Sequence, residues 1–326
     1  MASLCPAWPG GRFVCAFSGG GDSMALLALL RRHLGPGSLL AAHLDHGLRP
    51  GSAAEAQRAG EMAGRLGLEC RTARVEVGLL ARERGKGIEE AARAARYDFL
   101  LSILSCWPGD HVVTAHQAED QAETIIMKLA RGGGPGALVG IRAVSGPVLR
   151  PLLGFGRDEL RGYLRARGLG WLEDPSNADQ RFGRNLVRRE ILPQLGRLNP
   201  AFLAAFGRAS GLAACEEEFW DRHLDGLLER LGYREDGDWL GVLGQGLAGL
   251  GLAEARRVCG RLLRRVGPRR PGGGEPVSLA SADMILGIAG TPGGGGLDLP
   301  GGRRAEWRGQ YLYVGPASRY GRGSGA

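Results

Sequence analysis

The chain of 326 residues lacks the cysteine pairs, long apolar runs and leader segment that mark several classes of protein. Its six cysteines are scattered and no two form a CxxC pair, which argues against a zinc ribbon, an iron–sulfur site or a disulfide framework. No run approaches the roughly 18 apolar residues of a membrane span, and no charged-then-apolar signal opens the chain. We therefore expect a protein of the reduced cytoplasm that has no membrane partner.

The composition is typical of a globular protein with a basic surface. Hydrophobic residues make up 44% of the chain and charged residues 23%, and this length allows one large domain and a smaller one. The net charge of +8 and the pI of about 9.6 suit a polyanionic partner such as nucleic acid. An arginine-rich solvated surface would give the same charge.

Apolar runs and amphipathic patterns alternate through the N-terminal part of the chain. They predict strands at 13–17, 39–44, 70–77 and 111–115, and helices after 23, from Ser52 (with Glu55 completing a capping box), at 88–104 and at 118–131. This alternation indicates an α/β fold with a doubly wound parallel sheet. Ligands of such sheets bind at the carboxyl ends of the strands.

The pattern changes after about residue 195. Helices are predicted at 202–231, 252–266 and 281–289, and short strands at 297–314 around the Pro300-Gly301-Gly302 turn. We expect a larger domain at 1–200, a smaller, mainly helical C-terminal domain at 201–318 and a tail at 319–326.

The most informative segment is Ser18-Gly19-Gly20-Gly21-Asp22-Ser23, which joins a predicted strand to a predicted helix. Three glycines let the backbone approach a ligand closely, and the helix N-terminus adds a partial positive charge. No lysine follows the glycines, so the loop is not a Walker A motif, and a GxGxxG spacing does not fit. The segment predicts a phosphate cradle, although a chance turn is an alternative in a chain with 57 glycines.

Acidic residues follow two further predicted strands. Asp120 and Glu123 are three apart at a strand-to-helix junction, so both project from one side of the helix. Such a pair could hold magnesium, grip an ammonium group or supply a general base, and the helix dipole alone would also favour it. Asp45 could reach a nucleotide or its magnesium, or could cap a turn.

Two basic segments are candidates for binding anions. Arg93 and Arg96 could face a phosphate or a carboxylate, or could lie on a solvated helix face where Glu89 pairs with Arg93. The second segment suits an RNA backbone, or is a basic surface helix without a ligand. Its candidate residues are Asn177, Arg184, Asn185 and Arg188.

Taken in order, these motifs resemble the tRNA(Ile)-lysidine synthetases, a family of the PP-loop ATP pyrophosphatases. The shared motifs are the SGGxDS loop, the DHGLR turn, the IExxARxxRY helix, the acidic HHxDDQxET helix, the RGxGxxGLxG loop, the RPLL strand (150–153 here), the WxEDxSN segment and the RNxxR helix. The resemblance is dense over 12–195 and looser beyond. His116-Gln117 replaces the family's paired histidines and Glu119-Asp120 its paired aspartates, so Glu119 is a less secure ligand than Asp120.

The resemblance implies a carbon–nitrogen ligase that uses ATP. ATP would adenylate the C2 carbonyl oxygen of the wobble cytidine in the CAU anticodon of tRNA(Ile), and free L-lysine would then displace AMP to give lysidine. The implied roles are ATP binding for 18–23, Mg²⁺ binding for Asp22 and Asp45, lysine binding and proton transfer for Asp120 and Glu123, and stabilisation of the α-phosphate by Arg93 or Arg96. The resemblance also implies a tRNA-binding C-terminal domain and a homodimer. Within that domain we expect the basic helix 256–265 to contact the tRNA body.

There are two alternatives, a related enzyme and a protein of another class. A related tRNA thiolase would need CxxC pairs or a catalytic-loop cysteine, and the sequence shows neither. A non-catalytic nucleotide-binding or RNA-binding protein would not need both an intact glycine loop and an acidic cluster. Pyrophosphate release that depends on tRNA and lysine would separate the enzyme from such a protein.

Overall fold

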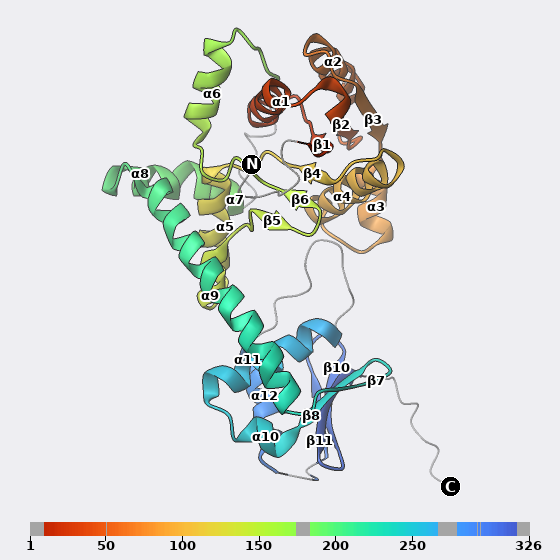
Figure 1. Ribbon diagram of the computed structural model, residues 1–326, viewed down its shortest axis with the longest axis vertical. Coiled ribbons are helices and arrows are strands. Elements are labelled where there is room, and N and C mark those ends of the chain that lie inside the picture. Colours follow the sequence, from red (N-terminus) through yellow and green to blue (C-terminus); the bar gives the residue numbers. More distant parts are fainter. Residues whose placement is uncertain are drawn as a thin grey trace. The chain divides into compact units, whose positions relative to one another are not determined.

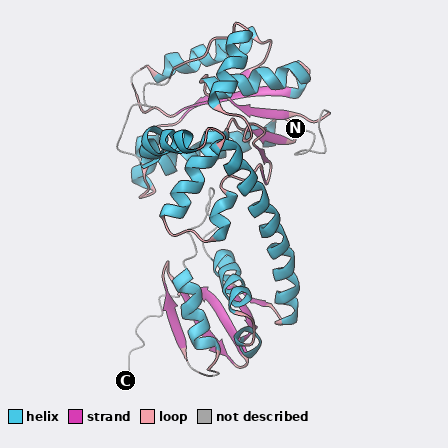
Figure 2. Cartoon of the chain, turned by 90° about the vertical axis from the view of Figure 1, so that its left-hand side faces the viewer, coloured by secondary structure: helices cyan, strands magenta, loops and turns pink. Residues whose placement is uncertain are grey.

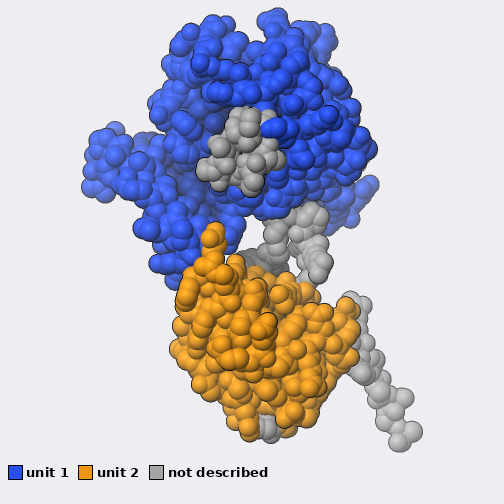
Figure 3. All heavy atoms as spheres, in the orientation of Figure 1, with its two compact units in different colours: residues 1–216 blue, residues 217–326 orange. Residues whose placement is uncertain are grey.

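The computed structural model describes residues 10–49, 51–173, 183–266, 279–291, 293 and 295–317. The chain divides into two compact units, residues 1–216 and 217–326 (Figure 3). Helix α9 (Phe202–Arg230) contributes to both units, and the division expected at 200/201 remains a prediction. The tail expected at 319–326 lies outside the described residues.

Unit 1 is built on a six-stranded sheet in the order β3-β2-β1-β4-β6-β5 (Figure 1). The strands are β1 (Phe13–Ala16), β2 (Leu39–Asp45), β3 (Cys70–Arg74), β4 (His111–Val113), β5 (Val144–Ser145) and β6 (Val148–Leu149). All neighbours pair in parallel except β5 and β6. The chain winds outward from β1 to β3 and then returns to β4 on the other side of β1, so the predicted doubly wound α/β fold is confirmed.

Helices cover both faces of this sheet because alternate residues of β1 point to opposite sides. Phe13 and Cys15 pack in one cluster with residues of α1, α2 and α6, whereas Val14 packs in another with residues of α4. The helical elements of unit 1 are α1 (Gly21–His33), η1 (Pro36–Ser38), α2 (Ser52–Arg65), α3 (Val77–Glu83), α4 (Ile88–Cys106), α5 (Ala118–Ala130), η2 (Pro135–Val139), α6 (Arg157–Ala166), α7 (Gly183–Leu186), the π-helical η4 (Val187–Ile191) and α8 (Leu192–Leu198).

Two local expectations are wrong. The capping box expected at Ser52 is absent, because Gly51 in the left-handed conformation (φ 94°) is the N-cap and Ser52 is already helical. The strand expected at 150–153 is a turn that follows the two-residue strand β6, since Pro151 has no N–H to continue a ladder.

Unit 2 packs helices against a five-stranded antiparallel sheet in the order β7-β8-β11-β10-β9 (Figure 2). Its elements are β7 (Arg234–Asp236), β8 (Trp239–Leu243), α10 (Gly244–Ala248), α11 (Leu252–Val266), α12 (Leu279–Ala289), β9 (Gly296–Leu299), β10 (Arg303–Arg308) and β11 (Tyr311–Pro316). Its core includes Val258 and Leu262 of α11 with Ile285, Leu312 and Val314. The sequence predicted the short C-terminal strands but not β7 and β8. Among the described helices, none is both long and apolar enough to span a bilayer.

Candidate active site

The glycine loop links β1 to α1 and is held by its own two serines. The Ser23 hydroxyl accepts from the Ser18 amide at 3.2 Å and donates to the Gly20 carbonyl at 2.9 Å, while Ser18 Oγ accepts from the Gly20 amide at 3.3 Å. Gly19 has a φ of +80°, a conformation that glycine adopts without strain. Because α1 begins at Gly21, its first amides have no partner within the helix. This geometry suits a phosphate cradle.

One wall of the loop comes from the Trp171-Leu172 segment. The Leu172 amide donates to the Gly19 carbonyl at 2.9 Å, and Leu172 pairs with Gly20 as a parallel bridge. A Cβ added to Gly19 would lie 2.7 Å from Leu172 Cδ1, and the positive φ would strain any larger residue here. The sequence predicted no role for Trp171 or Leu172, and their place in the WxEDxSN motif was the available signal. Asn177, in the same motif, lies outside the described residues.

The turn after β1 and the turn after β4 meet because these strands are neighbours at the point where the strand order reverses. Asp22 lies in the first turn of α1, where burial raises its pKa, the charge of Arg157 opposes this shift and that of Asp120 adds to it. Glu119 accepts from the Arg157 amide at 3.0 and 3.1 Å. Burial raises the pKa of Glu119, and the bond from the Arg157 amide opposes the shift. Glu119, which stands where the family has an aspartate, thus holds the first turn of α6 through its carboxylate.

Gln117 is the N-cap of α5. Its side-chain Oε1 accepts from the Glu119 backbone amide at 2.6 Å. Its backbone amide donates to Asp120 Oδ2 at 3.1 Å, which completes a capping box. The side chain is fully buried, and its Nε2 has no hydrogen-bond partner among the described residues. The glutamine that replaces the family's histidine therefore fixes the start of the acidic helix.

Asp120, Glu123, Arg184 and Arg188 form one cluster, which we name the acid–arginine cluster. Glu123 accepts from Arg184 Nε at 2.8 Å and from Arg188 Nε at 2.5 Å. Asp120 Oδ1 lies 3.3 Å from Arg184 Nη2 and 3.4 Å from Arg188 Nη2. The Glu123 side chain is fully buried and its charge requires such partners. The structure thus joins two residues predicted for catalysis to two predicted for RNA binding. Asn185 lies between these arginines on α7.

The remaining predicted residues are Asp45 at the end of β2 and two arginines of α4. Arg96 Nη2 lies 3.4 Å from His46 Nε2, and Arg93 stacks on Tyr97 at 5.1 Å. Asp45 accepts from the Gly47 amide at 2.9 Å and lies 3.6 Å from Arg74 Nη1. Burial alone would raise the pKa of Asp45, but the Gly47 amide and the charge of Arg74 help to lower it.

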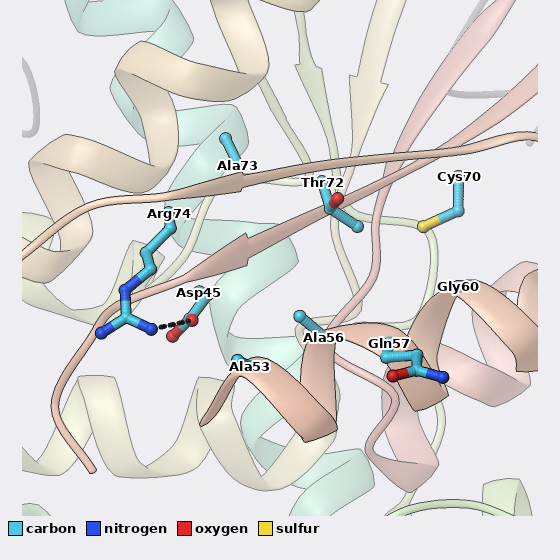
Figure 4. Close-up of a pocket in the computed structure, with 9 residues that line it drawn as sticks. All are labelled: Asp45, Ala53, Ala56, Gln57, Gly60, Cys70, Thr72, Ala73 and Arg74. Atoms are coloured by element: carbon cyan, nitrogen blue, oxygen red, sulfur yellow. Dashed lines mark ion pairs between the residues drawn. The ribbon is translucent and has the colours of Figure 1, made fainter. Parts of the chain in front are cut away.

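A pocket of about 530 Å³ adjoins the Asp45–Arg74 pair, whose side chains point toward one another in Figure 4. Small residues of α2 and the side chains of β3 form its walls. The lining residues are Asp45, Ala53, Ala56, Gln57, Gly60, Cys70, Thr72, Ala73 and Arg74. None of the glycine-loop residues lines this pocket.

Two histidines at the strand ends are neutral at physiological pH. Burial, followed by the charge of Arg150, lowers the pKa of His116 to about 3. Burial, followed by the charge of Arg96, lowers the pKa of His46 to about 4. Arg150 is itself buried and donates to the Arg142 carbonyl at 2.8 Å. None of these three residues is among the candidate site residues that the sequence predicted, although each belongs to a motif identified there.

Comparisons with known proteins agree with this geometry. Residues 3–195 match the PP-loop domain family. A tRNA(Ile)-lysidine synthase from Solibacter usitatus is 35% identical over 305 residues, which cover 91% of this chain and 67% of that protein. The chain belongs to the tRNA(Ile)-lysidine synthase family. A second family member, from Thermus thermophilus, is 42% identical over 228 residues, which cover 70% of this chain and 44% of that protein.

The chain spans only part of the length of these family members. The matched region covers 44% of the Thermus thermophilus synthase and 40% of that from Deinococcus deserti. Among solved structures, the U34-tRNA thiolase NcsA from Methanococcus maripaludis with its [4Fe-4S] cluster superimposes with a TM-score of 0.53 at 14% identity, covering 63% of this chain and 73% of the thiolase. At this identity the likeness shows a shared fold.

Proposed function

We propose that this chain makes lysidine by joining L-lysine to C2 of the wobble cytidine of a tRNA(Ile) with a CAU anticodon, at the expense of ATP. The observation that carries the proposal is the meeting of the phosphate cradle with the acid–arginine cluster at the β1/β4 switch point of a chain from this family. The phosphate cradle would bind the nucleotide, and the acid–arginine cluster would supply the groups that act on the charged amine of lysine.

In the first step, the C2 carbonyl oxygen of cytidine attacks the α-phosphorus of ATP. A new P–O bond forms, the bond to the bridging oxygen of the β-phosphate breaks, and pyrophosphate leaves with the electron pair. The amides behind Ser18–Ser23 hold phosphate oxygens, and Arg93 or Arg96 stabilises the charge that develops on the α-phosphate.

In the second step, the ε-amine of lysine attacks C2, the C2–O bond breaks and AMP leaves. The free amine has a pKa of about 10.4, so the site must take its proton before attack. The Asp120 side chain is 16% exposed, whereas the Glu123 side chain is fully buried between two guanidinium groups. We therefore assign proton transfer to Asp120, and to Glu123 the positioning of Arg184 and Arg188.

Magnesium fits the same site as a companion of ATP. Among the described residues, no three His, Cys, Asp or Glu side chains lie together as a metal site made by protein alone. Nucleotide-bound Mg²⁺ needs only one or two carboxylates, because phosphate oxygens and water complete its shell, and it neutralises phosphate charge. Asp22 of the glycine loop suits this role. Asp45 stays the second predicted ligand, with its carboxylate held by Gly47 and Arg74.

The deciding experiment is incorporation of radiolabelled lysine into a tRNA(Ile) transcript with a CAU anticodon, with and without ATP. Label that requires ATP and is absent from a methionine tRNA control would confirm the reaction and its specificity. ATP cleavage to AMP without label would point to another nucleophile on the same scaffold, such as the sulfur donor of a thiolase. No cleavage at all would favour a non-catalytic binding protein.

Asp120→Asn tests the assigned proton acceptor. We expect it to slow lysine incorporation about 100-fold or more, the usual contribution of a positioned base. Asp158→Asn is the matched control, since Asp158 is exposed on α6 outside the proposed site, and should leave the rate unchanged. If Asp120→Asn and Glu123→Gln both leave incorporation unchanged, the assignment is wrong.

We also propose that unit 2 binds the body of the tRNA and that the protein is a homodimer. The mass in solution tests the second statement, since a dimer would have twice the 34.5 kDa of the chain.

A further inference from the structure

Helix α6 places two arginines at the border of the glycine loop. Its buried residues Leu160 and Leu164 pack in the same core cluster as Leu26 and Leu27 of α1, the helix that the loop begins. Arg157 and Arg161 are one turn apart and lie next to this apolar stripe. We name these two residues the α6 arginine pair.

Trp171 connects the α6 arginine pair with the loop. The Arg161 guanidinium lies 6.0 Å from the centre of the Trp171 ring. Trp171 Cδ1 in turn lies 3.5 Å from the place of a Cβ on Gly21, the first residue of α1. The Arg157 backbone is fixed independently by Glu119, which accepts from its amide at 3.0 Å. Both arginines are therefore set beside the cradle by contacts that leave their guanidinium donors available.

The α6 arginine pair differs from the acid–arginine cluster because its guanidinium N–H donors remain available for a ligand. Within the described part of the chain, no ion pair joins Arg157 or Arg161 to a carboxylate, whereas Arg184 and Arg188 each contact two carboxylates. Arg161 Nε is buried and has no hydrogen-bond partner among the described residues. A guanidinium offers five donors, and a buried donor without an acceptor is costly. The charges of both arginines also act on Asp22.

We propose that Arg157 and Arg161 bind the β- and γ-phosphates of ATP and then the pyrophosphate that leaves. This inference rests on the proposed function only in requiring ATP as a substrate. Guanidinium groups bind phosphate oxygens in pairs and stabilise the charge that builds on the leaving group as the P–O bond breaks. The α-phosphate is left to the arginines of α4, so the two ends of the triphosphate have different cations.

The test compares three ligands on the full chain. Arg161→Gln should weaken the binding of ATP and of free pyrophosphate about tenfold, which corresponds to removing one charge-assisted hydrogen bond, while AMP binds as before. Arg157→Gln should show the same selectivity. Arg165→Gln, exposed on the same helix, is the matched control and should leave all three affinities unchanged. Arg161→Lys should recover part of the affinity, because it restores charge without the planar fork.

Several outcomes would overturn the proposal. Equal weakening of ATP, AMP and pyrophosphate would mean that Arg161 only supports the loop, and no change in any of them would remove it from the site. A decrease in tRNA affinity alone would place the pair on the RNA backbone instead. If wild-type protein fails to incorporate lysine but the pyrophosphate effect stands, the proposed function is wrong and this inference survives.

Discussion

At the scale of single residues, burial beside arginines keeps two histidines of the site uncharged. The pKa of His46 is lowered to about 4 and that of His116 to about 3, in each case first by burial. Below the ordinary histidine pKa of about 6.5, these imidazoles are protonated in the unfolded chain but stay neutral in the folded chain. Protonation therefore favours unfolding. The contribution of these groups to stability is present above pH 6.5 and is lost as the pH falls toward their folded values.

We therefore expect the melting temperature to fall as the pH drops from about 6.5 to 4, with both imidazoles still neutral at pH 5.5. NMR titration of the imidazole protons measures the pKa values directly. His116→Gln should flatten the acid side of the stability profile, whereas His33→Gln on the exposed side of α1 is the control. Titration of His116 near 6.5 would contradict the burial argument.

Gly140 is a residue-scale test of the RGxGxxGLxG loop. It has a φ of +60°, and a Cβ there would lie 2.6 Å from Gln121 Oε1. Gln121 is buried and holds the loop by accepting from the Ile141 amide at 2.6 Å and donating to the Val139 carbonyl at 3.1 Å. Gly140→Ala should cost about 1–3 kcal/mol of unfolding free energy through backbone strain. Gly134→Ala in the same loop meets nothing within 4 Å, and chemical denaturation should show it near neutral.

At the scale of elements, α9 already neutralises part of the basic face of α11. Arg257 pairs with Glu217 at 2.8 Å, and Arg261 pairs with Asp221 at 3.0 Å and Asp225 at 2.6 Å. Only part of the helix that was predicted to contact tRNA therefore has charge available for phosphate. Arg264 and Arg265 are exposed in its last turn, and Arg265 stacks on Tyr233 at 5.5 Å.

Replacing Arg264 and Arg265 by neutral residues should weaken tRNA binding and make it less dependent on salt. The slope of log K against log salt concentration should change by about one unit for each phosphate contact that is lost. Filter binding over a range of salt concentrations measures both quantities. Arg261→Gln is the internal comparison, since its charge is paired within the protein, and should leave the slope unchanged. Equal slopes for all the variants would remove α11 from the tRNA interface.

At the scale of the whole molecule, the two units have separate apolar cores. Leu164, fully buried, belongs to the cluster of unit 1, and Leu262, 1% exposed, to that of unit 2. Leu262→Ala should destabilise unit 2 by about 2–5 kcal/mol and lower the temperature of one calorimetric transition. Leu164→Ala should lower the temperature of the other transition. If both variants shift one common transition, the units unfold as a single cooperative body.

Local patterns were sufficient for many, but not all, of the elements of the fold. Helix 252–266 and the β1–loop–α1 unit follow from periodicity and glycine placement, because each depends on neighbours within a few residues. The start of α2 was missed by one residue, since a left-handed glycine replaced the expected serine cap. The parallel pairing of the strands also followed from alternation, because parallel strands need crossover helices.

The partners within the site depended on the tertiary structure alone. Arg184 meets Glu123 across 61 residues of chain, and Leu172 closes over Gly19 through a backbone hydrogen bond. No periodicity reports such pairs, because they depend on how loops at separate strand ends turn and on which buried charge must be neutralised. Sequence patterns therefore identified the charged groups of the site, and packing around the β1/β4 switch point decided which of them neutralise one another and which keep donors available for a ligand.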